Sequence, residues 1–282
     1  MDGLVKSEFR KIFTTNLWWA LLIPVVVLSF GASWLGSGFG AISSIEQELG
    51  RPLPLGLLTM SMSTNFSTIF AGLMGALAFA GEYRNKSITT TYLTGNPRGA
   101  VLGAKLITYT NLGLLYGLAN VLFASLGALA GAGLDGFGEG ADWLIVCAAG
   151  LLAMVLWTLL GVGFGAVVAN PVIVIIVLLV YKFVFEFVVD LFLIGSDASS
   201  VSSYLPGAAG SGIVGNLAVP IFISATAGAN EQYVPQELFE LLHFVFGGSY
   251  GHPWWLSLLT FAGYAAVFIL GGWYFSKRRD IT

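Results

Sequence analysis

Long, nearly uninterrupted runs of apolar residues divide this chain, and no segment between them is polar enough to form a soluble domain. A helix that crosses a bilayer needs about 20 mostly apolar residues. Six runs meet this requirement: 17–36, 66–81, 106–130, 143–169, 171–194 and 254–275. The second run is short unless its helix begins near Thr59. The pattern therefore predicts an all-α integral membrane protein with six transmembrane helices in a single domain, residues 1–282.

Two further segments depart from this simple pattern. In residues 3–14, apolar side chains recur at roughly helical spacing against Lys6, Arg10 and Lys11. This predicts an amphipathic helix within residues 1–16 that lies in the membrane interface. Residues 196–253 are too apolar for an ordinary loop, yet several glycines and Pro220 interrupt the stretch 205–229. Because broken backbone at membrane depth must be buried in protein, we expect a re-entrant external hairpin before the last span; two additional crossings are the alternative.

The basic residues are confined to the ends of these runs. Ten of the twelve Lys and Arg residues form three clusters: Lys6, Arg10 and Lys11; Arg84, Lys86, Arg98 and Lys105; Lys277, Arg278 and Arg279. Basic residues beside apolar runs mark the cytoplasmic side of a membrane. Six crossings bring all three clusters, and both termini, to that side. Nine acidic residues then fall outside, with Arg51 as the only external cation.

Composition excludes several classes of function. Hydrophobic residues make up 56% of the chain and charged residues only 10%, against about 25% in soluble domains. Because no basic face is available to neutralise phosphates, nucleic acid is not an expected partner. Cys147 is the only cysteine and lies within an apolar run, which predicts a buried small side chain and no metal site. The glycine pairs Gly113/Gly117 and Gly161/Gly165 have the spacing that allows close helix packing, within the chain or between subunits.

The only long cytoplasmic connection in this topology is residues 82–105. Residues 87–94 are expected to form a short helix, and Gly95, Asn96 and Pro97 a turn. A short helix held beneath the membrane by two spans can receive force from a cytoplasmic partner. On spacing alone, it can equally be a solvated tether whose charges only fix the orientation.

A family resemblance bears on this choice. The basic amphipathic N-terminal helix, the Trp-rich first span, the Gly-Glu-Tyr-Arg at 81–84 and the Ile-Thr-Thr-Thr-Tyr-Leu-Thr-Gly-Asn-Pro-Arg at 88–98 together resemble the permeases of type-2 ABC exporters of bacteria. The order of these features carries the resemblance, which extends over nearly the whole chain. It implies that the loop 82–105 couples to an ATPase subunit. The coupling residues implied are Glu82, Tyr83, Arg84, Ser87, Thr89, Thr90, Thr91, Pro97 and Arg98.

The resemblance also implies the partners. The chain has no Gly-x-x-x-x-Gly-Lys-Ser/Thr loop to hold a triphosphate, so no cofactor and no enzyme activity are expected in it. ATP and Mg would be bound by two copies of a separate ATPase subunit, and a second permease would complete the path in a bacterial inner membrane. An amphipathic drug, lipid or peptide is the expected substrate. The alternatives are a non-transporting scaffold or immunity protein and an ATP-independent secondary transporter.

Three ionisable residues lie inside the fifth apolar run. Lys182, Glu186 and Asp190 are spaced i, i+4 and i+8 on one helical face, and Lys182 is about halfway along the run. A charge at this depth costs at least about 2.5–3.5 kcal/mol. The three residues either neutralise each other within the bundle or line the permease interface or the substrate path. No His lies in any of the six runs, which argues against a membrane protease, and no metal ligands or catalytic residues are expected.

Overall fold

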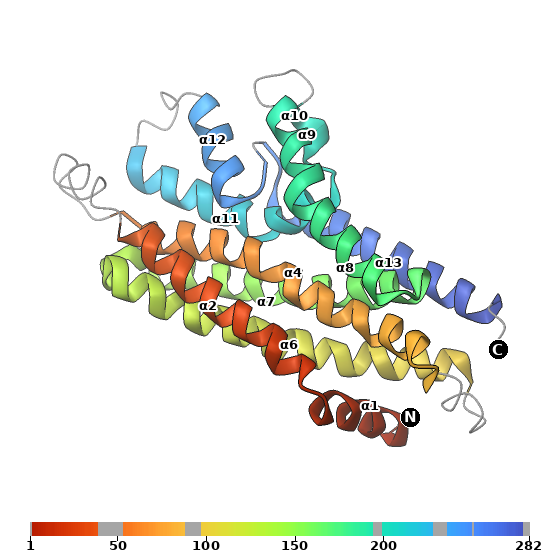
Figure 1. The fold of residues 1–282 in the computed structure, drawn as a ribbon. Coiled ribbons are helices and arrows are strands. Elements are labelled where there is room, and N and C mark those ends of the chain that lie inside the picture. Colours follow the sequence, from red (N-terminus) through yellow and green to blue (C-terminus); the bar gives the residue numbers. More distant parts are fainter. Residues whose placement is uncertain are drawn as a thin grey trace.

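The computed structural model describes residues 2–38, 53–87, 97–193, 199–227, 236–249 and 251–278, and this part of the chain is helical with short connections (Figure 1). The elements are α1 (Asp2–Thr14), α2 (Leu17–Ser37), α4 (Leu55–Arg84), α6 (Arg98–Ala132), η1 (Asp135–Phe137), α7 (Gly140–Val168), α8 (Pro171–Val180), the π-helix η2 (Tyr181–Phe185), α9 (Glu186–Leu193), α10 (Ser199–Ser202), α11 (Pro206–Ala227), α12 (Gln236–Phe246) and α13 (Trp254–Arg278).

Seven helices in the described part of the chain are long and apolar enough to cross a membrane, which is compatible with a multi-pass membrane protein. The sequence pattern predicted six. The additional helix is α11, in the segment expected to be a re-entrant hairpin. The glycines of α11 were expected to interrupt it, but the helix continues through them. Several of them are points of close packing instead: a Cβ at Gly210 would press on the Trp157 indole, and one at Gly212 on Ser257.

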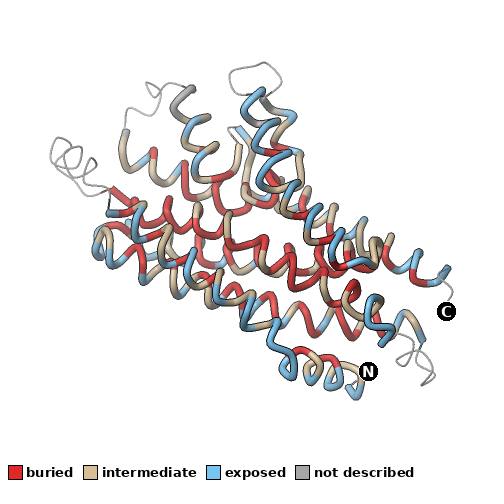
Figure 2. Tube along the Cα trace, in the orientation of Figure 1, coloured by how far each residue is buried: buried red, intermediate tan, exposed pale blue. Residues whose placement is uncertain are grey.

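The second apolar helix, α4, is much longer than the run 66–81, since it begins at Leu55. Its first half is rich in Ser and Thr, which weakened the hydrophobic signal. In the structure these hydroxyls are satisfied locally: Ser63 and Thr64 both donate to the carbonyl of Met60. α4 is also buried along most of its length (Figure 2), so polar atoms on it are hidden between neighbouring helices.

Close glycine contacts hold the centre of the bundle together. A side chain at Gly161 or Gly165 of α7 would overlap the α4 carbonyls of Gly72 and Ala76. Gly113 and Gly117 of α6 similarly lie against α7 at Val155 and Leu151. The spacing that predicted close packing is therefore confirmed, and these contacts are within one chain. Short separation between helices increases their van der Waals contact, which drives helix association in membranes.

A buried polar cluster joins α2, α4 and α6. The Asn120 amide donates to the Ser29 hydroxyl at 2.7 Å, and its carbonyl oxygen accepts from Thr64 at 2.9 Å. The Ser29 hydroxyl also lies 3.1 Å from that of Ser67. Because each of these polar groups has a partner, the cluster stabilises the register of the three helices.

The connection between α7 and α8 is as short as the sequence predicted. α7 ends at Val168 and is followed by Ala169, which has a left-handed backbone conformation. Asn170 then caps α8 by accepting from the N–H groups of Val172 and Ile173. Pro171 follows as the first residue of α8, where its missing N–H costs no hydrogen bond. The two helices therefore turn back on each other within two residues.

Both described ends of the chain lie at the same end of the bundle, which we call the α1 end (Figure 1). α1 is a helix, as its periodicity predicted, with Ile12 buried and Phe13 packed edge-on against Trp18 at 5.2 Å. All three basic clusters contribute residues to this end. The opposite end, the α12 end, holds α11 and α12.

Candidate functional site

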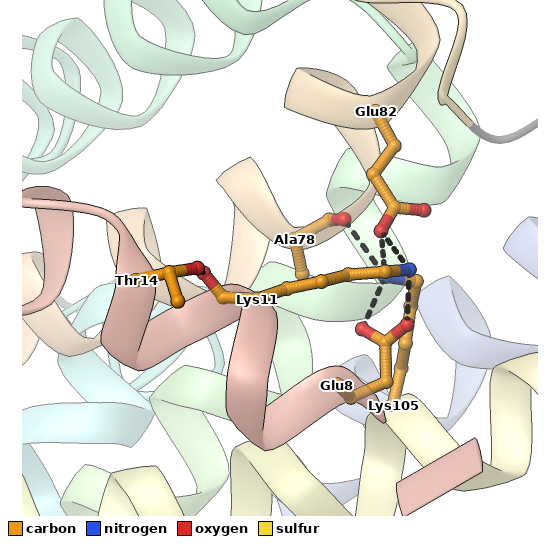
Figure 3. Close-up of polar contacts among 6 residues, drawn as sticks. All are labelled: Glu8, Lys11, Thr14, Ala78, Glu82 and Lys105. Atoms are coloured by element: carbon orange, nitrogen blue, oxygen red, sulfur yellow. Dashed lines mark hydrogen bonds and ion pairs between the residues drawn. The ribbon is translucent and has the colours of Figure 1, made fainter. Parts of the chain in front are cut away.

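A network of four charged side chains at the α1 end connects α1 with α4 and α6 (Figure 3). Lys105 of α6 bridges Glu8 of α1 at 2.7 Å and Glu82 of α4 at 2.9 Å. Lys11 of α1 bridges the same two carboxylates, Glu8 at 2.7 Å and Glu82 at 2.8 Å. We call this set the α1 network. It contains two carboxylates and two ammonium groups, so its formal charge is zero.

The α1 network is buried to different depths. The Lys105 side chain is 1% exposed, and it also donates to the carbonyl of Ala78 and lies 5.1 Å from the centre of the Phe79 ring. The Glu8 side chain is 5% exposed, Glu82 12% and Lys11 37%. Within the described ranges, the second oxygen of Glu82 has no hydrogen-bond donor. The network is therefore strongly paired around Glu8 and less complete at Glu82.

The ion pairs outweigh burial in setting the protonation of Glu8 and Lys11. Burial alone would raise the pKa of Glu8, but Lys105 and then Lys11 hold it below its ordinary value. Burial alone would lower the pKa of Lys11, whereas its hydrogen bonds and charge contacts with Glu8 and Glu82 raise it. Both groups are therefore charged at neutral pH.

The residues implied to couple to an ATPase fall into different environments. Glu82 belongs to the α1 network, while Tyr83 is half-buried against the core beneath α1. Arg84 and Ser87 are exposed at the end of α4, and Pro97 is exposed before α6. Thr89, Thr90 and Thr91, with most of the predicted short helix, lie outside the described residues.

Arg98, another of the residues implied to couple to an ATPase, bonds to α13 at the same end of the bundle. Its guanidinium donates to the carbonyl of Ser276 and, at 2.8 Å, to that of Lys277. These carbonyls belong to the last turn of α13, where a cation is favoured by the helix dipole and by unpaired acceptors. Arg98 therefore ties the start of α6 to the end of α13.

A second group of ionisable residues surrounds a cavity of about 360 Å³ towards the α12 end. The lining comes from α4, η2, α9, α10, α11, α12 and the segment that follows α12. It includes Asn65, Lys182, Glu186, Ser211, Glu240 and His243. The sequence analysis singled out Lys182 and Glu186, and both line this cavity.

The two intramembrane ionisable groups interact electrostatically with each other, and each also has other protein contacts. Lys182 donates to the side-chain oxygen of Asn65 at 2.7 Å and lies 5.4 Å from the centre of the Trp157 ring. Glu186 accepts a hydrogen bond from the backbone N–H of Gly207. The π-helix places Lys182 one turn from Glu186, and such turns recur at functional sites. The side chain of Asp190 lies outside the described side chains.

Sequence reasoning missed Glu8 and Asn65, and it gave His243 only as a weak signal on an external amphipathic helix. Glu8 had a detectable signal, because it shares the apolar stripe of α1 with Val5 and Ile12, three and four residues away. Asn65 had none, since its importance depends on Lys182, which is 117 residues later.

His243 is 5% exposed, and its Nδ1 lies 2.8 Å from the Phe239 carbonyl. Burial lowers its pKa below the ordinary value, although that contact opposes the shift.

The structure also locates Cys147, the single cysteine of the sequence. Cys147 is buried in the core, as its position within an apolar run predicted. Among the residues that the structure describes, no group of three His, Cys, Asp or Glu side chains is arranged to hold a metal ion.

No protein-family model matches the chain, and no curated protein is detectably similar to it.

Proposed function

We propose that this chain is the membrane-spanning permease subunit of an ATP-driven exporter in a bacterial inner membrane. The proposal begins from the family resemblance and is carried by one observation: the α1 network fastens α1 to the two helices that flank residues 88–96. A partner that pressed on this loop would act on a braced assembly rather than on a loose tether.

The proposed topology has six crossings, cytoplasmic termini at the α1 end and a re-entrant hairpin formed by α11 and α12. Two contacts support the hairpin. The first turn of α11 meets Glu186, about two-thirds of the way along the continuous helix formed by α8, η2 and α9, and the Tyr204 carbonyl just before α11 accepts from Tyr264 in the middle of α13. Further along, Asn216 donates to Ser257 near the start of α13. These contacts support a path for α11 from mid-depth outward beside α13.

In this proposal, two ATPase subunits bind ATP and Mg, and a second permease completes the translocation path. ATP binding and hydrolysis shift the pair between inward-open and outward-open populations. The substrate is an amphipathic drug, lipid or peptide. A non-transporting scaffold and an ATP-independent secondary transporter are the two competing functions, and each makes a different experimental prediction.

The direct test is purification of the full-length chain from its own membranes into nanodiscs. We expect a stoichiometric subunit with a Gly-x-x-x-x-Gly-Lys-Ser/Thr motif, and ATP hydrolysis that vanadate inhibits. A chain that purifies without an ATP-binding subunit would favour the scaffold. Ion-driven flux in proteoliposomes without ATP would instead establish a secondary transporter.

Coupling through the loop is tested by Arg84→Ala, because Arg84 is exposed and does not belong to the α1 network. Loss of one charge-assisted contact of about 1.5–3 kcal/mol should weaken substrate-stimulated ATP hydrolysis by about tenfold or more. Arg278→Ala is the matched control, since Arg278 is an exposed cation at the same end on α13. Equal effects of both variants would count against coupling at Arg84.

A further inference from the structure

The outer side of α1 carries two stripes of side chains that the α1 network does not use. Glu8 belongs to the buried side of this helix. Phe9 and Phe13 are four residues apart and form an aromatic stripe, while Lys6 and Arg10, three residues before each of them, form a basic stripe. Residues three and four apart are neighbours on a helix. The aromatic and basic stripes therefore lie side by side, and Phe13, Lys6 and Arg10 are exposed.

The charge of the basic stripe is not neutralised by its surroundings. The α1 network is formally neutral, so it uses the charge of Lys11 and leaves those of Lys6 and Arg10. Within the described ranges, neither of these two side chains forms an ion pair. Among the described residues at the α1 end, Asp2 is the exposed acid, and the exposed cations are Lys6, Arg10, Arg84, Lys86, Lys277 and Arg278.

α1 lies beside the start of a candidate membrane helix (Figure 1). Only residues 15–16 separate it from α2, which is long and apolar enough to cross a bilayer. Trp18 and Trp19 lie in the first turn of α2, and indole rings prefer the head-group region. The Phe13 ring packs edge-on against Trp18 at 5.2 Å, and Phe9 stacks on Phe13 at 6.2 Å. The aromatic stripe is therefore at head-group depth, where the upper acyl chains can cover it.

The opposite end of the bundle differs in charge. Beyond the end of α6, the exposed ionisable residues before α7 are Asp135 and Glu139, which are both acidic. A bilayer surface that contains anionic lipid therefore complements the α1 end and not this one. Each Lys or Arg near such a surface strengthens the attraction by about fivefold, and the attraction is lost at high salt.

We propose that the outer face of α1 binds anionic phospholipid, with the lipid phosphate at Lys6 and Arg10 and the upper part of the acyl chains against Phe9 and Phe13. This inference requires that α2 enters a bilayer. It involves neither ATP, an ATPase nor a transported substrate, and it is therefore independent of the proposed transport function.

The test measures which lipid surrounds α1 in the purified full chain, reconstituted in phosphatidylcholine nanodiscs. A bimane fluorophore is attached at Ser7→Cys, because Ser7 is exposed on α1 and Cys147 is buried. The quenchers are phosphatidylglycerol or phosphatidylcholine with a nitroxide near the head end of one acyl chain, which quenches only at short range. We expect half-maximal quenching at an about 25-fold lower mole fraction of phosphatidylglycerol, from about fivefold for each of the two cations.

A second label position is the matched control for general surface charge. The same fluorophore at Leu134→Cys reports on the α12 end, since Leu134 is exposed beside Asp135. This position should show no preference for phosphatidylglycerol. An equal preference at both positions would contradict a specific face on α1. In 1 M salt, where screening extends over only about 3 Å, the preference at Ser7→Cys should disappear.

Substitutions of the basic stripe define the contact. Lys6→Gln together with Arg10→Gln should abolish the preference, whereas Lys6→Arg together with Arg10→Lys should keep it. Arg278→Gln removes an exposed cation of α13 at the same end and should leave the quenching at Ser7→Cys unchanged. None of these substitutions touches the α1 network, so hydrogen exchange of the α1 backbone should stay slow and show that the helix remains docked.

Three results would overturn the proposal. Equal quenching by the two lipids, or a preference that survives the double glutamine variant, would leave this face for a protein partner. Competition by soluble glycerol phosphate would show a site for a free phosphate, because this compound has no acyl chain. Loss of the lipid preference with vanadate-sensitive ATP hydrolysis intact would refute this inference alone, and the opposite result would refute the proposed function alone.

Discussion

Replacing Lys105 by methionine removes the most buried member of the α1 network. The substitution keeps the length of the side chain and its packing on Phe79, but leaves Glu8 and Glu82 with Lys11 as their only charged partner among the described residues. Breaking a buried ion pair in this way costs about 3–5 kcal/mol, because a buried charge loses its compensation. Most of this cost should appear as weaker docking of α1, whose contacts with the bundle are few.

The size of this effect is measured by hydrogen exchange of the α1 backbone at neutral pH. A loss of about 3 kcal/mol raises the equilibrium constant for opening by about 100-fold or more. Reactivity of the Cys147 thiol reports separately on the bundle, because this thiol is buried in the core away from α1. We expect fast exchange in α1 and an unreactive thiol.

Two controls show whether the effect arises from pairing. Lys6→Met removes an exposed cation from the same helix and should leave exchange nearly unchanged. The double variant Glu8→Gln with Lys105→Met keeps the Lys11–Glu82 bridge and restores a formal charge of zero. It should cost less than the sum of the single variants by about 0.5–3 kcal/mol. Exchange in Lys105→Met equal to that of Lys6→Met, or strict additivity in the double variant, would refute the reasoning.

Two more predictions concern pH and helix capping. The contribution of Glu8 to α1 docking is present above about pH 4.5 and is lost as the pH falls through its lowered pKa. The contribution of Lys11 is present below about pH 10.5 and is lost as the pH rises through its raised pKa. Spin labels on α1 and on the far end of the bundle should therefore report a fixed distance between these limits, which broadens as the pH falls through the lowered pKa of Glu8 or rises through the raised pKa of Lys11; a distance that does not change over the whole acid and alkaline titration would contradict this. Gly207→Ala should lower the midpoint of thermal unfolding because its methyl group displaces the Glu186 carboxylate, whereas Gly263→Ala, with open space around it, should not; equal midpoints would rule out the cap.

The hydrophobic pattern located the membrane helices well because it measures the property that the bilayer selects. It failed where another helix, rather than lipid, surrounds the segment. The first half of α4 is rich in Ser and Thr and hidden in the bundle, so its helix begins eleven residues before the run at Phe66. In α11 the glycines looked like breaks, yet they are points of close approach, as at Gly210 beside Trp157. Hydropathy alone does not distinguish a glycine that ends a helix from one that packs it.

The candidate sites were predictable only where a single charged residue stood out from its sequence context. Lys182 and Glu186 stood out because charges are rare in apolar runs. Their partners did not, since Asn65 and Gly207 come from other helices and have no unusual sequence context. Glu8 was overlooked for the opposite reason: a charge on an amphipathic helix is ordinary, and only its place on the apolar stripe indicated burial.

α4 is the element common to both sites, and this has a physical consequence. It carries Asn65 beside Lys182 and Glu82 in the α1 network, separated by 17 residues or about 25 Å of helix. Because α4 is buried along this length and packed closely on α7 through Gly161 and Gly165, bending it would break many contacts. A force applied beside Glu82 is therefore transmitted to Asn65 more readily than it is absorbed. If the chain is driven by an ATPase at the α1 end, α4 is a continuous mechanical connection to the cavity lined by Asn65 and Lys182.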